Sequence, residues 1–382
     1  MTTGLVSPTV RTKHGSNRNS SNWLKIKFIQ RISSIMREII NLFRLEGDLI
    51  SYDRFGRGHI NDTYRVVTTD QEYLFQKINH KIFKDVSGMM GNIQRITDHL
   101  PAAYDRFGIT SQEALQLIQT HRLENYVHHV EGYFRMFDFK SHLKSLDVPE
   151  SEEQIFEGAK SYGFFLRALN DFNPSDLSVT LVDFHNLDYR IRNFKEAMAK
   201  IKNVKSHPAA DQIAMVTLFT QQLLPVWNLD ALSLVRKRVT HNDTKFNNVL
   251  LNQLNKGCCV IDLDTVMPGI VHYDFGDGIR SSACTAAEDE SDLQWVSLDR
   301  NRFFAFKEGY LEAAKDELDA TEIQFLPLSG AYMAFIMGLR FLTDYMEGNT
   351  YYKIDHPNHN LDRCKNQFKL SQDILHQLND LK

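Results

Sequence analysis

The chain has 382 residues, of which 42% are hydrophobic, 11% aromatic and 24% charged, a composition that excludes a disordered or fibrous protein. Its net charge of −4 argues against a general nucleic-acid-binding protein. The longest apolar stretch, Ala331 to Leu339, is about half a membrane span, so we expect no transmembrane helix. Four cysteines without a C-x-x-C pair disfavour a zinc site or a disulfide framework, and favour a cytoplasmic protein.

The first 37 residues differ from the rest, because they carry seven Lys or Arg and no Asp or Glu. Residues 1–27 are predicted to be a disordered basic extension, and Met36 is a candidate for the true initiator. An organelle transit peptide has the same basic, Ser-rich composition and is the alternative. From Phe28 to Phe43 apolar residues recur at steps of three and four, which predicts an amphipathic helix that packs on the fold.

Strand-like and helical patterns occupy different parts of the remaining chain. The strand-like runs are Leu49–Phe55, Thr63–Val67, Tyr73–Ile78, Ala114–Thr120 and Tyr133–Phe137, interrupted by a helical stretch from Asp85 to Leu100. The later helical patterns cover 152–170, 188–205, 209–226, 293–317, 321–346 and 366–381, with a strand-like island from Val249 to Leu263. Strands followed by helices predict an α+β fold, with a sheet-rich N-lobe over 28–138 and a helical C-lobe over 139–382.

The chemically most informative residues flank the strand-like island. His241, Asp243, Lys245 and Asn248 form the pattern H-x-D-x-K-x-x-N, and the next apolar strand ends at Asp262. We expect a hairpin that holds a carboxylate and a carboxamide opposite a second carboxylate, the set that phosphoryl transfer needs. One carboxylate would orient the attacking hydroxyl, while an amide oxygen and the other carboxylate would hold magnesium. A nearby lysine would balance the charge of the moving phosphoryl group.

With these residues the sequence resembles the protein-kinase-like phosphotransferases, in the aminoglycoside phosphotransferase and choline kinase branch. Asp243 stands 19 residues before Asp262, close to the spacing of that superfamily. The literal Asp274-Phe275-Gly276 lies 31 residues after Asp243, too far along the chain to be the magnesium motif. The resemblance implies a bilobal protein-kinase-like fold. It also implies the following roles: Asp243 as catalytic base assisted by Lys245, Asn248 and Asp262 as magnesium ligands, and His241 and Asp274 as structural supports.

An ATP site of this architecture predicts features upstream. Gly56 and Gly58 lie between two strand-like runs, where glycines let a backbone approach phosphates, although a hairpin turn explains them equally well. No G-K-S/T sequence is present, which excludes a Walker A loop. Lys77 is the expected phosphate-pairing lysine, with a register that could shift by one residue, and strand alternation turns Gln76 to the opposite face.

The strand that runs into the linker between the lobes is expected to bind adenine through the backbone of Met136 and Asp138. A protein kinase would pair its lysine with a helix glutamate, but the stretch from Asp85 to Leu100 contains no Glu. The chain also lacks an A-P-E segment. Both departures argue against a regulated protein kinase.

Several segments resemble the N-acetylhexosamine 1-kinase group within this superfamily. They are residues 58–64, 241–250, 261–269, 273–277 and 339–345. The resemblance implies transfer of a phosphoryl group from ATP, with magnesium, to the anomeric C1 hydroxyl of N-acetylglucosamine or N-acetylgalactosamine. It makes His59, Arg340 and Tyr351 sugar-contact candidates. Arg340 ends an apolar run where an unpaired guanidinium is costly to bury, so it should meet a carboxylate, a ligand or solvent.

Other functions share the same motifs. A kinase for an amino alcohol, an aminoglycoside or homoserine would want acidic residues around a cationic acceptor, and Asp277, Glu288, Asp289 and Glu290 keep this open. A non-catalytic pseudokinase is disfavoured, because the acidic and amide positions are all present. The expected partners are therefore ATP and a small amino sugar, with neither nucleic acid nor membrane.

Overall fold

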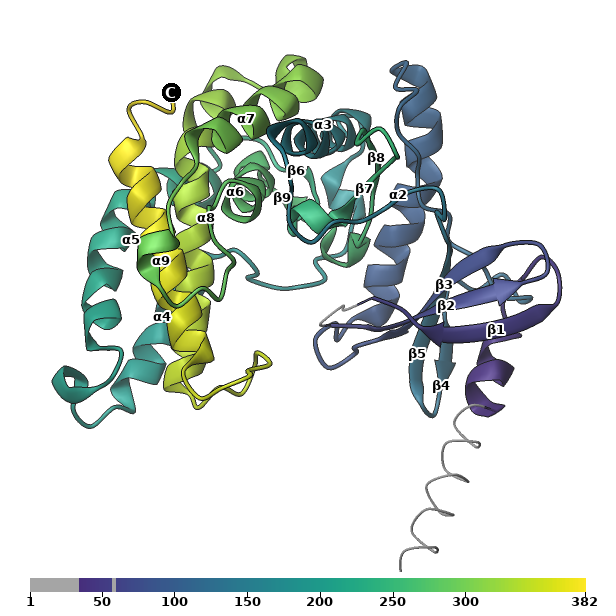
Figure 1. The fold of residues 1–382 in the computed structure, drawn as a ribbon, viewed down its shortest axis with the longest axis horizontal. Helices are drawn as coiled ribbons and strands as arrows, with labels where there is room; N and C mark the ends of the chain where they lie inside the picture. Colours follow the sequence, from purple (N-terminus) through teal and green to yellow (C-terminus); the bar gives the residue numbers. More distant parts are fainter. Residues whose placement is uncertain (1–33, 57–59) are drawn as a thin grey trace, which may run out of the picture.

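The computed structural model describes residues 34–56 and 60–382, which form a sheet-rich N-lobe and a larger helical C-lobe (Figure 1). The predicted basic extension over 1–27 and two predicted site residues, Gly58 and His59, lie outside the described residues. The α+β architecture expected from the order of strands and helices is confirmed.

The N-lobe is built on an antiparallel sheet with strand order β1-β2-β3-β5-β4. Its strands are β1 (Leu49–Arg54), β2 (Asp62–Thr68), β3 (Glu72–Ile78), β4 (Val127–His129) and β5 (Gly132–Asp138). Helix α2 (Val86–Arg106) stands between this sheet and the C-lobe (Figure 1). Asp85 caps the helix, since its side chain accepts a hydrogen bond from the Gly88 N–H at 2.8 Å.

The two faces of the sheet pack against different cores. On one face, Tyr73 and Phe75 are buried with residues of the leading segment, including Ile40 in a helix over residues 34–40. On the other face, Ile78 and Phe137 join the main core that continues through α2 into the C-lobe. Successive side chains of β3 therefore point alternately toward the C-lobe and toward the leading segment.

The C-lobe is an assembly of seven long helices with two small β-ribbons. The helices are α3 (Glu152–Ala168), α4 (Leu187–Ala199), α5 (Ala210–Ala231), α6 (Val271–Ser282), α7 (Arg300–Ala314), α8 (Ala320–Met346) and α9 (His359–Gln377). The ribbons pair β6 (Arg238–Thr240) with β9 (Met267–Gly269), and β7 (Val249–Leu251) with β8 (Gly257–Val260). By length and composition α8 could cross a membrane, but 83% of its apolar window is buried inside the fold.

Three predictions of secondary structure need correction. Residues 114–120 form an extended segment and not a strand of the sheet, because they meet the sheet only at isolated bridges such as Leu117 to Phe137. The predicted helix over 293–317 is shorter, since Asp299 caps α7 by accepting a hydrogen bond from the Arg302 N–H. Helix α9 begins at His359, earlier than expected.

Candidate active site

The loop between β6 and β7 is held in place by Asp274 at the start of α6. The Asp274 carboxylate accepts hydrogen bonds from the backbone N–H groups of His241 at 2.8 Å and Asn242 at 2.7 Å. Asn242 has a positive φ of 64°, so these two bonds stabilise a backbone turn that most residues avoid. The ring of His241 is anchored separately, with Nε2 2.8 Å from the carbonyl oxygen of Ile261. The structure thus places His241 and Asp274 where they position the loop.

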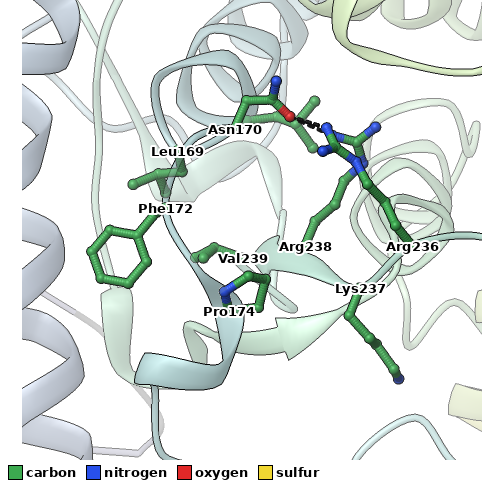
Figure 2. A pocket seen from close by; sticks show the side chains of 9 residues that line it. Leu169, Asn170, Phe172, Pro174, Arg236, Lys237, Arg238 and Val239 are labelled. Carbon is green, nitrogen blue, oxygen red and sulfur yellow. Dashed lines mark hydrogen bonds between the residues drawn. The ribbon is translucent and has the colours of Figure 1, made fainter.

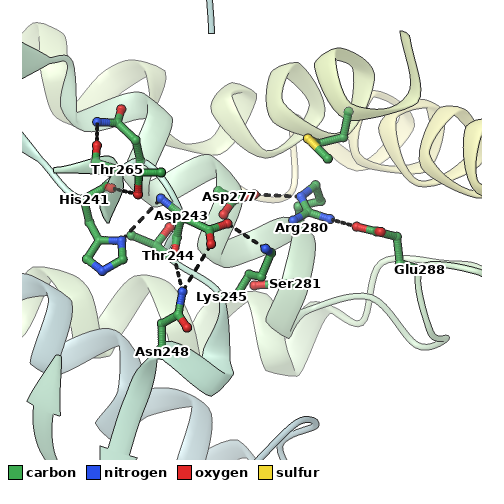
Figure 3. A network of polar contacts seen from close by, with 12 residues as sticks. His241, Asp243, Thr244, Lys245, Asn248, Thr265, Asp277, Arg280, Ser281 and Glu288 are labelled. Carbon is green, nitrogen blue, oxygen red and sulfur yellow. Dashed lines mark hydrogen bonds and ion pairs between the residues drawn. The ribbon is translucent and has the colours of Figure 1, made fainter. Parts of the chain in front are cut away.

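Asp243 lies at the tip of this loop with two polar partners (Figure 3). Its carboxylate is 2.8 Å from Lys245 Nζ, and Asn248 Nδ2 donates to it at 3.3 Å. Burial opposes ionisation of this carboxyl, but the Lys245 ammonium outweighs burial and holds the pKa of Asp243 below its usual range. The residue therefore presents an ionised carboxylate, which can orient or accept the proton of a hydroxyl group.

Asp262 follows β8 and differs from Asp243 in having no partner within the described residues. No hydrogen bond or ion pair in residues 34–56 and 60–382 involves its carboxylate, and its backbone is left-handed with φ 60°. Burial, together with the charges of Asp264 and Asp243, raises the pKa of Asp262 to about 7. A carboxylate kept in such a site without a partner suits a bound cation, which would stabilise its ionised form.

Asn248 lies beside Asp262 on the β7–β8 hairpin, since its carbonyl oxygen accepts the Ile261 N–H at 2.9 Å. Its side-chain amide nitrogen donates hydrogen bonds to Asp243, which leaves its side-chain oxygen available to bind a cation. No cluster of three or more His, Cys, Asp or Glu side chains within the described ranges could hold a metal alone. Asn248 and Asp262 instead offer two oxygen ligands, as expected where magnesium is held jointly with phosphate groups.

A buried polar network between the lobes was not predicted. Arg135 on β5, only 1% exposed, pairs with Asp264, which is 3% exposed. Gln76 accepts a hydrogen bond from Arg135 Nε at 2.9 Å, and Asn61 Nδ2 donates to Asp264 at 2.8 Å. An arginine inside the apolar run Tyr133–Phe137 is the signal that could have revealed it, because such a charge needs a partner. Asp264 is therefore a buried ion-pair partner and not a solvated turn carboxylate.

The prediction for Lys77 is wrong about its face. Gln76 and Lys77 do point to opposite sides of β3, but Gln76 faces the C-lobe through Arg135. Lys77 lies on the other side, with Nζ 5.8 Å from the centroid of the Phe134 ring. Phe134 belongs to the separate core formed with the leading helix. Strand alternation correctly predicted that Gln76 and Lys77 point to opposite faces of β3. Only the packing of the sheet decided that the face with Gln76 meets the C-lobe.

The two residues whose backbone was predicted to bind adenine already form hydrogen bonds within the protein. The Met136 carbonyl accepts the Ile118 N–H at 2.8 Å, and the Asp138 N–H donates to Gln116 at 3.0 Å. The edge of β5 at these two residues is therefore already covered by the extended segment over 114–120. Adenine would have to meet the chain beyond Asp138 or on another edge.

Of the predicted glycine-rich turn between β1 and β2, the structure describes Phe55 and Gly56. Gly56 has a positive φ of 73°, a conformation that favours glycine, and a Cβ there would meet nothing within 4 Å. The neighbouring Phe55 packs edge-on against Phe139 of the linker, with ring centroids 5.2 Å apart. This contact holds Phe55, directly after β1, close to the segment that joins the lobes.

Arg340, on α8, forms no ion pair within the described residues. Its guanidinium carbon lies 5.1 Å from the centroid of Phe184 and 5.6 Å from that of Tyr352. Tyr351 is 58% exposed and packs edge-on against Tyr352. The structure therefore joins Arg340 and Tyr351 through one aromatic neighbour and leaves the guanidinium donors without a carboxylate.

A small cavity of about 100 Å³ lies beside β6, next to the loop that carries Asp243 (Figure 2). Arg236 and Arg238 both donate to the side-chain oxygen of Asn170 at its wall. Arg238 is also paired with the buried Glu322. The cavity is far smaller than a typical ligand pocket of roughly 300–1,000 Å³, so it is no nucleotide site.

Comparison with known proteins shows which solved structures have a similar fold. The chain resembles the solved structure of an aminoglycoside phosphotransferase from Alicyclobacillus acidocaldarius, with a TM-score of 0.59 and 12% identity over 90% of this chain and 94% of that one. A microcompartment-associated aminopropanol kinase matches with a TM-score of 0.62 and 15% identity, over 91% and 98% of the two chains. A spectinomycin phosphotransferase, solved with ADP and spectinomycin, matches with a TM-score of 0.54 and 13% identity over 91% and 98%.

These likenesses show a protein-kinase-like fold. The profile of the phosphotransferase enzyme family, known as APH, matches residues 51–310, which is well over half of the chain. That match includes the loop with Asp243, the hairpin with Asp262 and the supporting Asp274. The chain therefore belongs to the phosphotransferase enzyme family.

Proposed function

We propose that this phosphotransferase uses ATP and magnesium to phosphorylate the anomeric C1 hydroxyl of an N-acetylhexosamine. The observation that carries the proposal is the ionised Asp243, held 2.8 Å from Lys245 at the end of a braced loop. An anomeric hydroxyl is more acidic than an ordinary alcohol, so a carboxylate can receive its proton readily. The resemblance to hexosamine 1-kinases in the segments around Asp243 and Asp262 supports the sugar.

In the proposed reaction the acceptor hydroxyl gives its proton to Asp243, and its oxygen attacks the γ-phosphoryl group in line. The bond to ADP breaks as the new bond forms, so no phospho-enzyme is made and ADP leaves. Asn248 and Asp262 would hold magnesium, which supplies positive charge to the triphosphate. Lys245 carries a raised pKa, because its interactions with Asp243 and Asp277 outweigh the effect of burial, so it remains positively charged. It can therefore stabilise negative charge on the phosphoryl oxygens.

The charge of the acceptor side favours a sugar over an amino alcohol or an aminoglycoside. Arg280 forms ion pairs with both Asp277, at 2.8 Å, and Glu288, at 2.5 Å (Figure 3). Asp289 lies 3.6 Å from the ring of His359, and Glu290 accepts the Asp292 N–H. Each of the four acids that would suit a cationic acceptor thus already has a protein partner.

A cytoplasmic location fits the four cysteines, which are buried and unpaired.

One assay tests the proposal directly. The purified chain is incubated with ATP, magnesium and a panel of free hexosamines, aminoglycosides, amino alcohols and homoserine, and the products are identified by phosphorus NMR. We expect a sugar 1-phosphate. Phosphate at C6, or turnover of an amino alcohol alone, would overturn the 1-kinase while leaving the family membership intact.

A further inference from the structure

Two arginines of the C-lobe, Arg190 and Arg340, have no acidic partner among the described residues, unlike the three buried arginines of the fold. Arg135, Arg238 and Arg280 are each buried and each paired with a carboxylate. Arg190 and Arg340 are partly buried, and neither forms an ion pair with a residue of the described ranges. Guanidinium groups in this state retain free donors and uncompensated charge.

Both guanidinium groups converge on Phe184. Arg190 Nη2 donates to the Phe184 carbonyl at 2.7 Å, while Arg340 lies over the Phe184 ring. Arg190 Nε is buried without a hydrogen-bond partner. Like charges this close repel each other, and burial together with Arg340 lowers the pKa of Arg190 to about 10. The pair therefore costs free energy in the absence of an anion.

His185 connects this pair to the catalytic loop. Its Nε2 lies 3.1 Å from the carbonyl oxygen of Asn242, the residue before Asp243. Burial, the charge of Arg340 and that of Arg190 lower the pKa of His185 to about 3, so this histidine is neutral and adds no charge of its own. Phe184 and His185 thus link the two arginines to the loop that carries Asp243, and His185 interacts electrostatically with Arg340, Arg190 and Asp243 alike.

The carboxylate best placed to neutralise Arg340 is used elsewhere. Asp344 lies four residues further along α8, a spacing that normally favours a helical ion pair. Its carboxylate instead accepts the backbone N–H groups of Thr350, Tyr351 and Tyr352, and the side-chain amide of Asn360. These bonds order the loop after α8, and they leave Arg340 without an acidic partner among residues 34–56 and 60–382.

We infer that Arg190 and Arg340 form a subsite for an anionic group on the acceptor, a sulfate ester or a carboxylate remote from the hydroxyl that reacts. The inference rests on the proposed function, because it names the class of hexosamine that the same site prefers. Arginine suits such groups, since its planar donors bind sulfate-like and carboxylate oxygens in pairs. An acceptor with an ammonium group would be repelled.

The test measures kcat/KM with ATP and magnesium for N-acetylglucosamine, its 6-sulfate, the corresponding C6 uronic acid, and glucosamine, whose amine is charged. We expect an anionic sugar to be preferred over the neutral one by roughly 10- to 100-fold, the worth of a hydrogen bond to a charged group. The values of kcat/KM for the 6-sulfate and for the uronic acid show whether the subsite prefers a sulfate ester or a carboxylate. Glucosamine should be the poorest acceptor.

Three variants assign the preference to Arg190. Arg190→Gln should lower the anionic-to-neutral ratio of kcat/KM by roughly tenfold or more. Arg190→Lys should keep part of it, and Arg192→Gln is the matched control, because Arg192 is exposed and lies over the same Tyr189 ring. Thermal unfolding checks that each variant is folded. A ratio near one in the wild type, or a ratio unchanged by Arg190→Gln, overturns the inference.

Failure of the proposed function is recognised separately. If no hexosamine of any charge is phosphorylated, that function is wrong, and the subsite is then tested with inorganic sulfate alone. Millimolar sulfate that raises the melting temperature of the wild type more than that of Arg190→Gln supports an anion subsite. An identical response of the two proteins overturns it.

Discussion

At the scale of single residues, the site depends on how burial and charge act on neighbouring carboxylates. Asp243 and Asp262 lie close enough to influence each other, yet their pKa values shift in opposite directions. Lys245 stabilises the ionised form of Asp243, whereas the Asp262 carboxylate has no partner among the described residues and burial raises its pKa. Two carboxylates whose environments differ in this way are suited to different roles, one to a proton and the other to a cation.

The first prediction concerns Asp243. We expect Asp243→Asn to lower kcat by roughly 10²–10⁴-fold, because the amide cannot receive the proton of the acceptor. Turnover is followed by ADP release, and the melting temperature shows whether the fold is kept. Asp211→Asn, at an exposed position of the same lobe, is the control and should turn over at the wild-type rate. Wild-type activity in Asp243→Asn would refute its role.

The second prediction compares Arg135 with Lys77. Arg135→Met leaves Asp264 buried and unpaired, so the free energy of unfolding should fall by about 3–5 kcal/mol. Lys77→Met removes a charge on the opposite face and should change stability by less than about 1 kcal/mol. Urea denaturation measures both.

The same pair also tests the corrected orientation of β3. Because Lys77 faces away from the C-lobe, Lys77→Met should leave the affinity for ATP unchanged in titration calorimetry. A large loss of ATP affinity in this variant would restore the original assignment of Lys77 as a phosphate-pairing lysine.

At the scale of elements, the C-lobe depends on helices that cross at glycines. A Cβ at Gly309 of α7 would lie 2.1 Å from the carbonyl oxygen of Phe156 in α3. A Cβ at Gly163 of α3 would in turn lie 2.6 Å from the carbonyl oxygen of Tyr310. Backbone on both sides limits any relaxation, so α3 and α7 approach closely only because both positions lack a side chain.

The third prediction follows from this crossing. Gly309→Ala should destabilise the protein by about 1–3 kcal/mol, the usual effect of overpacking. Gly91→Ala, in α2, is the matched control, because a Cβ there meets nothing within 4 Å. It should stabilise the protein by about 0.5–1 kcal/mol, since alanine favours a helix. Equal effects of the two substitutions in urea denaturation would contradict the proposed close crossing.

Element types could be predicted largely from periodicity, whereas element ends depended on caps and on pairing. The apolar residues of 321–346 recur in a helical pattern, and α8 covers Ala320–Met346. Residues 114–120 read as a strand because they are apolar and extended, but their neighbours in space come from β5 and the leading segment. Such long-range partners are not encoded in local periodicity.

At the scale of the whole molecule, the two lobes are joined by polar contacts as well as by the core. Asn92 of α2 donates to the carbonyls of Ser178 and Val266, and Asn61 and Arg135 of the N-lobe both reach Asp264. These contacts hold the sheet against the hairpin that carries Asp262. Binding of a ligand between the lobes should therefore stabilise both together.

The fourth prediction concerns magnesium and ATP. With magnesium, ATP at about 100 times its Kd should stabilise the folded protein by about 2.7 kcal/mol, measured as a rise in melting temperature. EDTA should remove most of this rise. Asp262→Ala should remove it too while leaving the ligand-free protein folded, because no described residue depends on the Asp262 carboxylate. An undiminished rise in Asp262→Ala would rule out its role as a metal ligand.

The sequence by itself determined the expected phosphotransferase chemistry, because the spacing of Asp243, Asn248 and Asp262, before and after the β7–β8 hairpin, is a local property of the chain. Tertiary structure alone decided which face of β3 meets the C-lobe, since alternation defines two faces without naming the buried one. It also decided that Arg190 and Arg340, on separate helices, both contact Phe184 and have no acidic partner in the part of the chain that the structure describes. A charge is paired or unpaired only through neighbours that folding brings from distant parts of the chain.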